Sequence, residues 1–460
     1  MRTEGPNHSR QRNSARPSGE QSEPTRFPIA EIRAAFPALQ ITDDAAPRIY
    51  FDTPAGTQVP RHVIERTTRY FTEQNANSGG FFRTSAETDA LLDEAHAAMA
   101  DLLGASDGGE IIFGQNMTSL TFAVSRSIGR ELRTGDEIIV TRMDHDANVS
   151  PWLLLARDLD LTVRWLPFNR ETFHYDLDAL AALITPRTRL AAINYASNAI
   201  GTINDVNAMA SMLRDAGALT YVDAVQLVPH RLADVRALGC DFLVCSAYKF
   251  FGPHQGILWG RRELLERLEP YKVRPASNDL PVRFETGTLS HEGMAGTLGA
   301  VEYLEWLGGL VSDGADGAGG DGSTDADSPR RARLRRAMSA AERYERMLTA
   351  RLLDGLEANP RVRVYGITDR DDLHERVPTV GITVNGEHPD DTARRLAAEN
   401  VFVWSGHYYA VEVIRHLGLE SSGGMVRIGL AHYHTDAEVD RLVEVLARPF
   451  QGLASSVTGH

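Results

Sequence analysis

Cysteine is nearly absent from the sequence. Only Cys240 and Cys245 occur among 460 residues, and both lie in or beside the apolar segment DFLVC. This usage excludes a disulfide framework and is typical of a reducing compartment. Their apolar surroundings favour the interpretation that both are small buried hydrophobic residues.

Long apolar runs and an excess of positive charge are also missing. No stretch approaches the roughly 20 apolar residues of a membrane span, and the N-terminal segment lacks the apolar core of a secretion signal. The net charge is -14, which argues against a general nucleic-acid binder because phosphate contacts need clustered Lys and Arg. A locally positive pocket for a small anion stays compatible with this charge. We expect a soluble, cytoplasmic protein that binds neither membrane nor nucleic acid and holds no metal.

Two segments are too poor in large apolar residues to build a core. The N-terminal segment is rich in Arg, Ser, Pro and Gly, and residues 308–331 are mostly Gly, Asp and Ser. The rest is long enough for two packed domains, with 42% hydrophobic residues. We therefore expect a disordered tail (1–26), a large domain (27–305), a flexible insertion (306–332) and a small domain (333–460). The first part of the large domain is expected to lie near the small one.

Short apolar runs alternate with amphipathic stretches in the large domain. The expected strands are EIIF (110–113), DEIIVTR (136–142), RLAAINYA (189–196), ALTYVDAV (218–225) and DFLVCSAY (241–248). Helical spacing is found over 89–105 and 204–218. Such alternation predicts an α/β fold with a largely parallel sheet. After the insertion, a long helix (334–359) and an alternating strand (424–433) predict a smaller α+β domain.

Lys249 follows a strand expected to be buried and precedes a Gly-Pro turn. Open α/β sheets bind ligands at such strand ends. A partly desolvated amine is nucleophilic, as a Schiff-base lysine must be. The alternatives are a surface lysine in a loop, or the Ser-x-x-Lys motif of penicillin-recognising hydrolases. That motif should open a helix and be accompanied by Lys-Thr-Gly, which is absent.

Two further features belong to strand ends. Asp223 closes another expected strand, where a carboxylate can pair with a protonated pyridine nitrogen or simply cap a helix or turn. Residues 114–119 form a polar turn that enters a helix with apolar Leu120, Val124 and Ile128. Free backbone N–H groups and the helix dipole make such a turn a phosphate site, although every α/β protein has turns of this kind.

Taken together, these motifs resemble those of the class V aminotransferases of fold type I, most closely the cysteine desulfurases. The resemblance covers roughly residues 48–445, with the motifs in the same order. Besides DAVQ and SAYK, which contain Asp223 and Lys249, they are YFDTPAGTQVP (50–60), MDHDANVSPW (143–152), SNAIGT (197–202) and RFETGT (283–288). It implies a seven-stranded, mostly parallel sheet in the large domain, pyridoxal 5'-phosphate (PLP) as cofactor and an amino-acid substrate.

The resemblance implies contacts to the pyridine ring. His145 would stack on the ring, Asn198 and Gln226 would lie at its 3-hydroxyl, and Asp223 would pair with its nitrogen. Lys249 would carry the cofactor as a Schiff base. Each residue also has a structural reading, as a surface histidine or a turn residue for example. Their preserved order favours the cofactor site.

The resemblance implies a phosphate site made by Met117, Thr118 and Ser246. Tyr248 stands where the family usually has a histidine, so that phosphate contact is expected to differ.

The resemblance also implies a homodimer with shared sites. Gly287 and Thr288 would reach the partner subunit's phosphate. Arg427 would grip the substrate carboxylate, a bidentate task that suits guanidinium, and Ala55 would line the substrate side. A surface salt bridge is the structural alternative for Arg427.

The sequence departs from the desulfurases at their mobile cysteine. In VWSGHYYAVE (403–412) the glycine and histidine of the family loop are present, but Tyr409 occupies the cysteine position. A phenol cannot carry a persulfide, so we predict that persulfide-forming desulfuration is lost. Tyr408 and Tyr409 would line the substrate site, and Tyr409 could donate a proton. Aromatic packing is the alternative.

The remaining chemistry needs PLP, Lys249 and a carboxylate clamp, with His145 and Tyr409 as further catalytic candidates. The leading hypothesis is β-elimination from a cysteine derivative, a C–S lyase. Aminotransfer and epimerisation are alternatives, followed by desulfuration by an unusual route and by decarboxylation. The alternative from a different class of function is a binding protein that keeps the fold but catalyses no reaction. The intact Lys249, Asp223 and Arg427 argue against this alternative.

Overall fold

The computed structural model describes residue 1, residues 27–311 and residues 328–448. The predicted tail lies almost entirely outside the described residues, and so do residues 312–327 of the predicted insertion. The edges of that insertion were predicted wrongly. Residues 306–310 complete helix α10 (His291–Leu310) and residues 329–332 begin helix α11 (Pro329–Glu357). Buried Leu307 continues the apolar face of α10, and Ser328 caps α11 with Pro329 in its first turn.

The large sheet has seven strands, of which only β10 runs antiparallel to its neighbours. In spatial order they are β4 (Ile111–Gly114), β10 (Gly256–Gly260), β9 (Phe242–Ser246), β8 (Leu219–Asp223), β7 (Thr188–Asn194), β5 (Glu137–Thr141) and β6 (Thr162–Leu166). Each strand expected in this sheet is present, and its ends lie within two residues of the expected bounds. The predicted mostly parallel sheet is confirmed.

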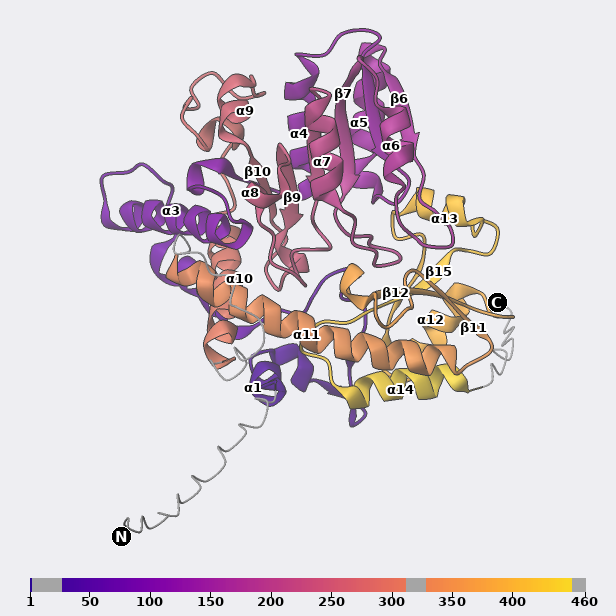
Figure 1. The fold of residues 1–460 in the computed structure, drawn as a ribbon. Helices are drawn as coiled ribbons and strands as arrows, with labels where there is room; N and C mark the ends of the chain where they lie inside the picture. Colours follow the sequence, from indigo (N-terminus) through magenta and orange to yellow (C-terminus); the bar gives the residue numbers. More distant parts are fainter. Residues whose placement is uncertain (2–26, 312–327, 449–460) are drawn as a thin grey trace, which may run out of the picture.

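Helices cover both faces of this sheet (Figure 1). Alternate strand residues divide between two cores, as the period of two requires. One core includes α3 (Arg83–Leu103), α7 (Val206–Asp215), α8 (Val235–Leu238) and α10, and the other includes α4 (Met117–Gly129), α5 (Ser150–Leu159) and α9 (Arg262–Arg267). Burial on both faces explains why the strands read as continuous apolar runs.

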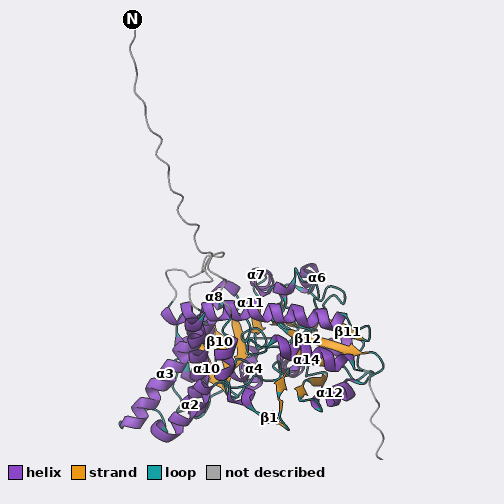
Figure 2. Ribbon diagram, turned by 90° about the horizontal axis from the view of Figure 1, so that it is seen from below, coloured by secondary structure: helices purple, strands orange, loops and turns teal. Residues whose placement is uncertain are grey.

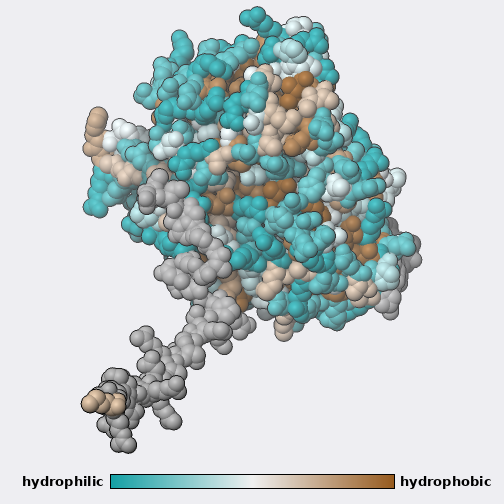
Figure 3. Space-filling view, viewed as in Figure 1, coloured by the Kyte–Doolittle hydropathy of each residue, from teal (hydrophilic) through white to brown (hydrophobic). Residues whose placement is uncertain are grey.

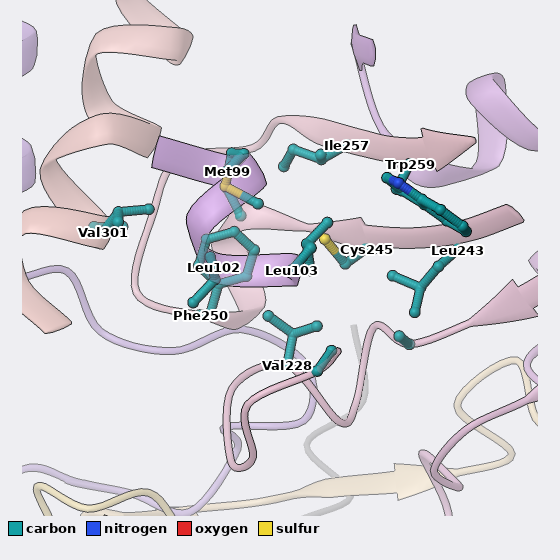
Figure 4. Packing of buried hydrophobic residues seen from close by; sticks show 14 of the residues in the cluster. Met99, Leu102, Leu103, Val228, Leu243, Cys245, Phe250, Ile257, Trp259 and Val301 are labelled. Atoms are coloured by element: carbon teal, nitrogen blue, oxygen red, sulfur yellow. The ribbon is translucent and has the colours of Figure 1, made fainter. Parts of the chain in front are cut away.

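Both cysteines belong to the first of these cores. Cys245 lies on β9 among Leu103, Leu243 and Ile257 (Figure 4). Burial raises the pKa of the Cys240 thiol to about 12 and that of Cys245 further. The interpretation of both as small buried hydrophobic residues is confirmed, and neither is poised to act as a thiolate.

A second, antiparallel sheet lies beside the long α11. Its strands, in order, are β11 (Val362–Tyr365), β12 (Thr379–Val384), β15 (Met425–Gly429) and β14 (Trp404–Gly406). Helices α11 and α14 (Asp436–Ala447) run side by side next to it (Figures 1 and 2). Val426 and Ile428 of β15 enter the core with these helices, whereas Arg427 faces the other way, as the alternation predicts.

The N-terminal part of the chain links the two sheets. Strand β3 (Ile49–Tyr50) pairs in parallel with β13 (Val401–Phe402), and Asp52 bridges to Gly429. The following loop reaches the large sheet, where Thr57 N–H donates to the Tyr248 carbonyl (3.1 Å). This part of the chain therefore contacts both strand β15 of the small sheet and the turn after strand β9 of the large sheet.

The remaining elements are short or peripheral. They are α1 (Ile29–Ala34), β1 (Thr42–Asp43), β2 (Ala46–Pro47), α2 (Arg61–Arg69), α6 (Leu177–Leu183), α12 (Pro389–Ala397), α13 (Val411–Leu417) and single turns at Pro37–Gln40, Tyr70–Gln74, Gly108–Glu110, Asp146–Asn148, Ala247–Lys249, Val282–Phe284 and Leu373–Glu375. In the face seen in Figure 3, hydrophobic side chains form separate patches among hydrophilic ones. No helix of the described chain has the length and apolar character needed to cross a bilayer.

Candidate active site

A cavity of about 540 Å³ lies at the carboxyl ends of the large sheet's strands and is closed on one side by the small sheet. Its volume is within the range of small-molecule sites. Twelve of the fifteen predicted site residues line it: Ala55, Met117, Thr118, His145, Asn198, Asp223, Gln226, Tyr248, Lys249, Tyr408, Tyr409 and Arg427. The structure thus brings together residues that are up to 372 positions apart (Ala55 and Arg427).

Lys249 is buried in the turn after β9. Its Nζ donates to the carbonyls of Pro54 (2.6 Å) and Ala55 (3.0 Å). Burial, and next the charge of Arg427, lower the pKa of this amine to about 7. The amine is thus largely neutral just above that pH, which makes it a nucleophile and a base.

Asp223 ends β8 and has no cation at hydrogen-bonding distance among the described residues. Its Oδ1 accepts the N–H of Val225 (2.9 Å). Burial raises its pKa to about 6, against the lowering effects of that hydrogen bond and of Lys249. A buried carboxylate of this kind favours a cationic ligand group beside it, such as a pyridinium nitrogen.

His145 provides a flat, uncharged ring. Its Nδ1 accepts the N–H of Ala147 (3.0 Å), which places the ring proton on Nε2. Burial, with the charges of Lys249 and Arg427, lowers its pKa to about 3. A neutral imidazole is suited to stacking on a heteroaromatic ring. The Tyr409 ring stacks on the imidazole, with centroids 5.4 Å apart.

The start of α4 and the end of β9 are suited to a phosphate group. Asn116 caps α4 by accepting the N–H of Ser119 (2.9 Å), and the first N–H groups of a helix lack intrahelical partners. Ser246 does not line the cavity, but its buried Oγ has no hydrogen-bond partner. Asn198 Oδ1 and Arg427 Nε are also buried without partners. Unpartnered polar atoms in the cavity lining, with Ser246 outside it, fit a polar cofactor such as PLP.

Arg427 is a buried guanidinium that the protein leaves incompletely bonded. Its Nη1 donates to the Asn198 carbonyl (3.0 Å), and its Cζ lies 4.5 Å from the centre of the Tyr408 ring. Burial lowers its pKa to about 10. No carboxylate of the described chain forms an ion pair with this buried side chain, so the alternative of a surface salt bridge is excluded.

The loop that contains Tyr408 and Tyr409 is fixed in place. Both residues have left-handed backbone conformations (φ 48° and 59°), which are unfavourable for non-glycine residues. The Tyr408 carbonyl accepts the side-chain N–H of Asn198 (3.0 Å), and the Tyr409 carbonyl accepts the N–H of Asp146 (2.7 Å). The Tyr408 hydroxyl also donates to the Met425 carbonyl.

Gly287 and Thr288 lie outside the cavity and are exposed. Their expected contact is with the phosphate of a partner subunit, which stays a prediction.

The comparison with known families identifies the fold. A model described as "Aminotransferase class-V" matches residues 49–310 and 334–442. The chain belongs to the class V aminotransferase family. These enzymes are PLP-dependent, so this protein is a PLP-dependent enzyme.

Individual relatives point to one branch of the class V family. A cysteine desulfurase of Yersinia pestis (strain Pestoides F) is 32% identical over 437 residues, covering 92% of this chain and 98% of its own. Two solved structures each cover 92% of this chain and 98% of their own. They are the apo cysteine desulfurase of Thermococcus onnurineus NA1 (TM-score 0.79, 27% identity) and the S-sulfonic acid form of cysteine desulfurase CsdA from Escherichia coli (TM-score 0.76, 28% identity).

Three features of the cavity were missed from the sequence. Phe122 and Trp404 line its wall, and the half-buried Asp52, which does not line it, has a buried, unpartnered Oδ1 and interacts through its charge with Arg427 and Lys249. The lysine content of the sequence is a further signal that points to Lys249. The whole chain has only two lysines, Lys249 and Lys272, all other basic residues of its 48 Lys and Arg being arginine. Because arginine cannot deprotonate in proteins, a lysine kept in such a chain indicates a need for a neutral amine.

The two lysines allow a direct test of the lowered pKa. In the cofactor-free protein, acylation of Lys249 by a small anhydride should rise with pH and be half-maximal near pH 7, since only the neutral amine reacts. Lys272, whose Nζ donates to the Ala276 carbonyl and which does not line the cavity, is the internal reference. Peptide mass spectrometry measures both. Identical profiles would contradict the effect of burial on Lys249.

Proposed function

We propose that the enzyme catalyses β-elimination from an S-substituted cysteine, releasing a thiol, pyruvate and ammonia. The observation that carries this proposal is that no cysteine lines the cavity, where the family resemblance assigns Tyr409 to the position of the desulfurase cysteine. The only two thiols of the chain, Cys240 and Cys245, are buried in the core with raised pKa values. Without a thiolate at the cavity, an enzyme of this family has no acceptor for sulfane sulfur.

The residues of the cavity support PLP in one orientation. Lys249 would carry it, Asp223 would face its ring nitrogen, and His145 would lie against its ring. The start of α4, with Met117 and Thr118, and Ser246 would hold its phosphate. Gln226 was expected to bind the 3-hydroxyl of the ring, but its Nε2 already donates a hydrogen bond to the Pro54 carbonyl (2.9 Å). When bound, PLP supplies an electron sink that makes the substrate Cα proton acidic.

The protein's own groups perform the other steps. Arg427 binds the substrate carboxylate through its unsatisfied N–H groups. Lys249, which is neutral near physiological pH, takes the Cα proton. The Cβ–S bond then breaks and its electron pair leaves with sulfur as a thiolate. Tyr409 is placed to protonate that thiolate. Water converts the remaining three-carbon unit to pyruvate and ammonia, so no oxidant or reductant is needed.

Three predictions about organisation accompany the proposal. The boundary between large and small domains at the insertion, the homodimer with Gly287 and Thr288 reaching a partner, and the cytoplasmic location all stay predictions.

Product analysis tests the proposal. The purified enzyme with S-substituted L-cysteines should release thiol and pyruvate in equal amounts. With L-cysteine it should leave no persulfide on the protein. A new amino acid made from an added 2-oxo acid, or a racemised substrate without pyruvate, would instead support aminotransfer or epimerisation and would overturn elimination.

Tyr409→Cys asks whether the missing thiol alone separates this enzyme from the desulfurases. We expect sulfane sulfur production from L-cysteine to stay at the wild-type level. The loop backbone is bonded to Asn198 and Asp146, so the introduced thiol cannot travel with the sulfur. Tyr409→Ser is the control for side-chain loss. A stable persulfide formed on the introduced thiol during turnover would show that the hydrogen bonds of the loop do not prevent sulfur transfer.

A further inference from the structure

One wall of the cavity has no task in holding the cofactor or the substrate carboxylate. We use the term aromatic wall for the cavity-lining Phe122 of α4, Trp404 of β14 and Tyr409 of the following loop, together with the apolar Pro151 of α5. The side chains assigned to PLP and to the carboxylate are different residues, although Phe122 shares helix α4 with Met117 and Thr118. The aromatic wall is therefore available to the part of the substrate beyond its β-carbon.

Trp404 lies next to the carboxylate-binding residue. Trp404 of β14 is paired directly with Arg427 of β15. Directly opposed residues of antiparallel strands project to the same side of the sheet, with Cβ atoms about 5 Å apart. An amino acid held by Arg427 thus has the indole within reach of its side chain. Trp404 is 51% exposed, an unusual fraction for so large an apolar side chain.

Tyr409 is presented in a fixed position. Its ring stacks on His145 and its carbonyl is bonded to Asp146 N–H, yet 66% of the residue is exposed. Rigid aromatic side chains bind ligands at a low cost in conformational entropy. Together with Trp404, it offers exposed apolar surface on the wall of the cavity.

Charge restricts what this wall accepts. Asp146 also lines the cavity and accepts a hydrogen bond from the Ser150 hydroxyl (2.6 Å). Its carboxylate disfavours an anionic group in the same space.

From this arrangement, and resting on the elimination proposed above, we infer that the substrate's S-substituent is bulky, apolar and uncharged, such as an aromatic or branched group. Trp404 and Tyr409 contact this substituent and determine specificity, and Asp146 rejects anionic analogues.

Binding of carba analogues tests this inference separately from elimination. In these amino acids a methylene replaces sulfur, so no thiolate can leave. We compare the analogue of S-benzyl-L-cysteine with norvaline, the analogue of S-methyl-L-cysteine, and with L-aminoadipate, the analogue of S-carboxymethyl-L-cysteine. Calorimetry on the PLP-loaded enzyme should give the benzyl analogue at least about tenfold higher affinity than norvaline, and L-aminoadipate the lowest.

Substitutions in the aromatic wall test whether it causes the difference in affinity between the benzyl analogue and norvaline. Trp404→Ala should remove most of the benzyl preference while leaving norvaline affinity nearly unchanged, and Tyr409→Ala provides a second, independent removal of wall surface. Tyr271→Ala is the matched control, because Tyr271 is 52% exposed but does not line the cavity. Equal affinities for the benzyl analogue and norvaline, or equal losses of both in Trp404→Ala, would overturn the inference.

Turnover separates this inference from the proposed function. If the benzyl analogue binds preferentially but S-benzyl-L-cysteine yields no thiol and pyruvate, the proposed elimination is refuted and the binding role of the aromatic wall is supported. If S-methyl-L-cysteine is converted as efficiently as S-benzyl-L-cysteine and the analogues bind equally, the proposed elimination is supported and the specificity role of the aromatic wall is refuted.

Discussion

Lys249→Ala is expected to lower turnover of an S-substituted cysteine by about 10³-fold or more, because it removes both the cofactor-bearing amine and the base for the Cα proton. Steady-state release of pyruvate measures the effect. Lys272→Ala is the matched control, since the chain has no other lysine, and should keep wild-type kinetics. Full activity of Lys249→Ala would refute the assignment of this residue.

A structural collapse would also lower turnover, so Lys249→Ala needs a second readout. The buried amine has a lowered pKa, which means that its charged form is disfavoured in the fold. Its removal ends this unfavourable burial but also takes a donor from the Pro54 and Ala55 carbonyls. Because these effects oppose each other, the thermal midpoint should stay near that of the wild type. Added methylamine should restore part of the activity if the loss is that of an amine alone. A folded variant that no small amine rescues would argue that Lys249 acts through structure.

Arg427→Gln is expected to raise KM for the amino acid by about 100-fold, equivalent to about 2.8 kcal/mol, because a buried charge pair with the substrate carboxylate is lost. Its effect on kcat should be small. Removing an incompletely bonded buried charge should not lower thermal stability. An unchanged KM would place the substrate carboxylate elsewhere.

Arg376 provides the contrast within the same chain. It is equally buried, and burial lowers its pKa to about 10 as well. Its N–H groups donate to the backbone carbonyls of Ile200, Ile367, Val377 and Thr379. Arg376→Gln should therefore lower stability, by about 2 kcal/mol, as buried carbonyls lose their donors. If both variants changed KM alike, the distinction between a structural and a substrate-binding arginine would be lost.

The fold was predictable because its strands carry a strong local signal. Strands buried on both faces must be apolar throughout, as in β5 and β9, and polar residues directly after such strands mark the ligand edge. This rule alone brought Asp223 and Lys249 together. The alternation of β15 placed Arg427 on the side opposite to the core.

Other features depend on contacts that no local pattern encodes. Trp404 enters the cavity through its pairing with Arg427, and the backbone of Tyr409 is set by a bond to Asp146. The ends of α10 and α11 were missed because Gly, Asp and Ser dominate the composition there, whereas burial of Leu307 and the cap at Ser328 extend the helices. Ser246 was predicted as a phosphate ligand, and only its orphaned hydroxyl gives a physical reason.

The central claim is that Lys249 carries the cofactor. Borohydride reduction of the PLP-loaded enzyme fixes the pyridoxyl group on its lysine, and peptide mass spectrometry then locates it. The account predicts one label per chain, on the peptide with Lys249. Label on Lys272, or no label in a protein saturated with PLP, would contradict it.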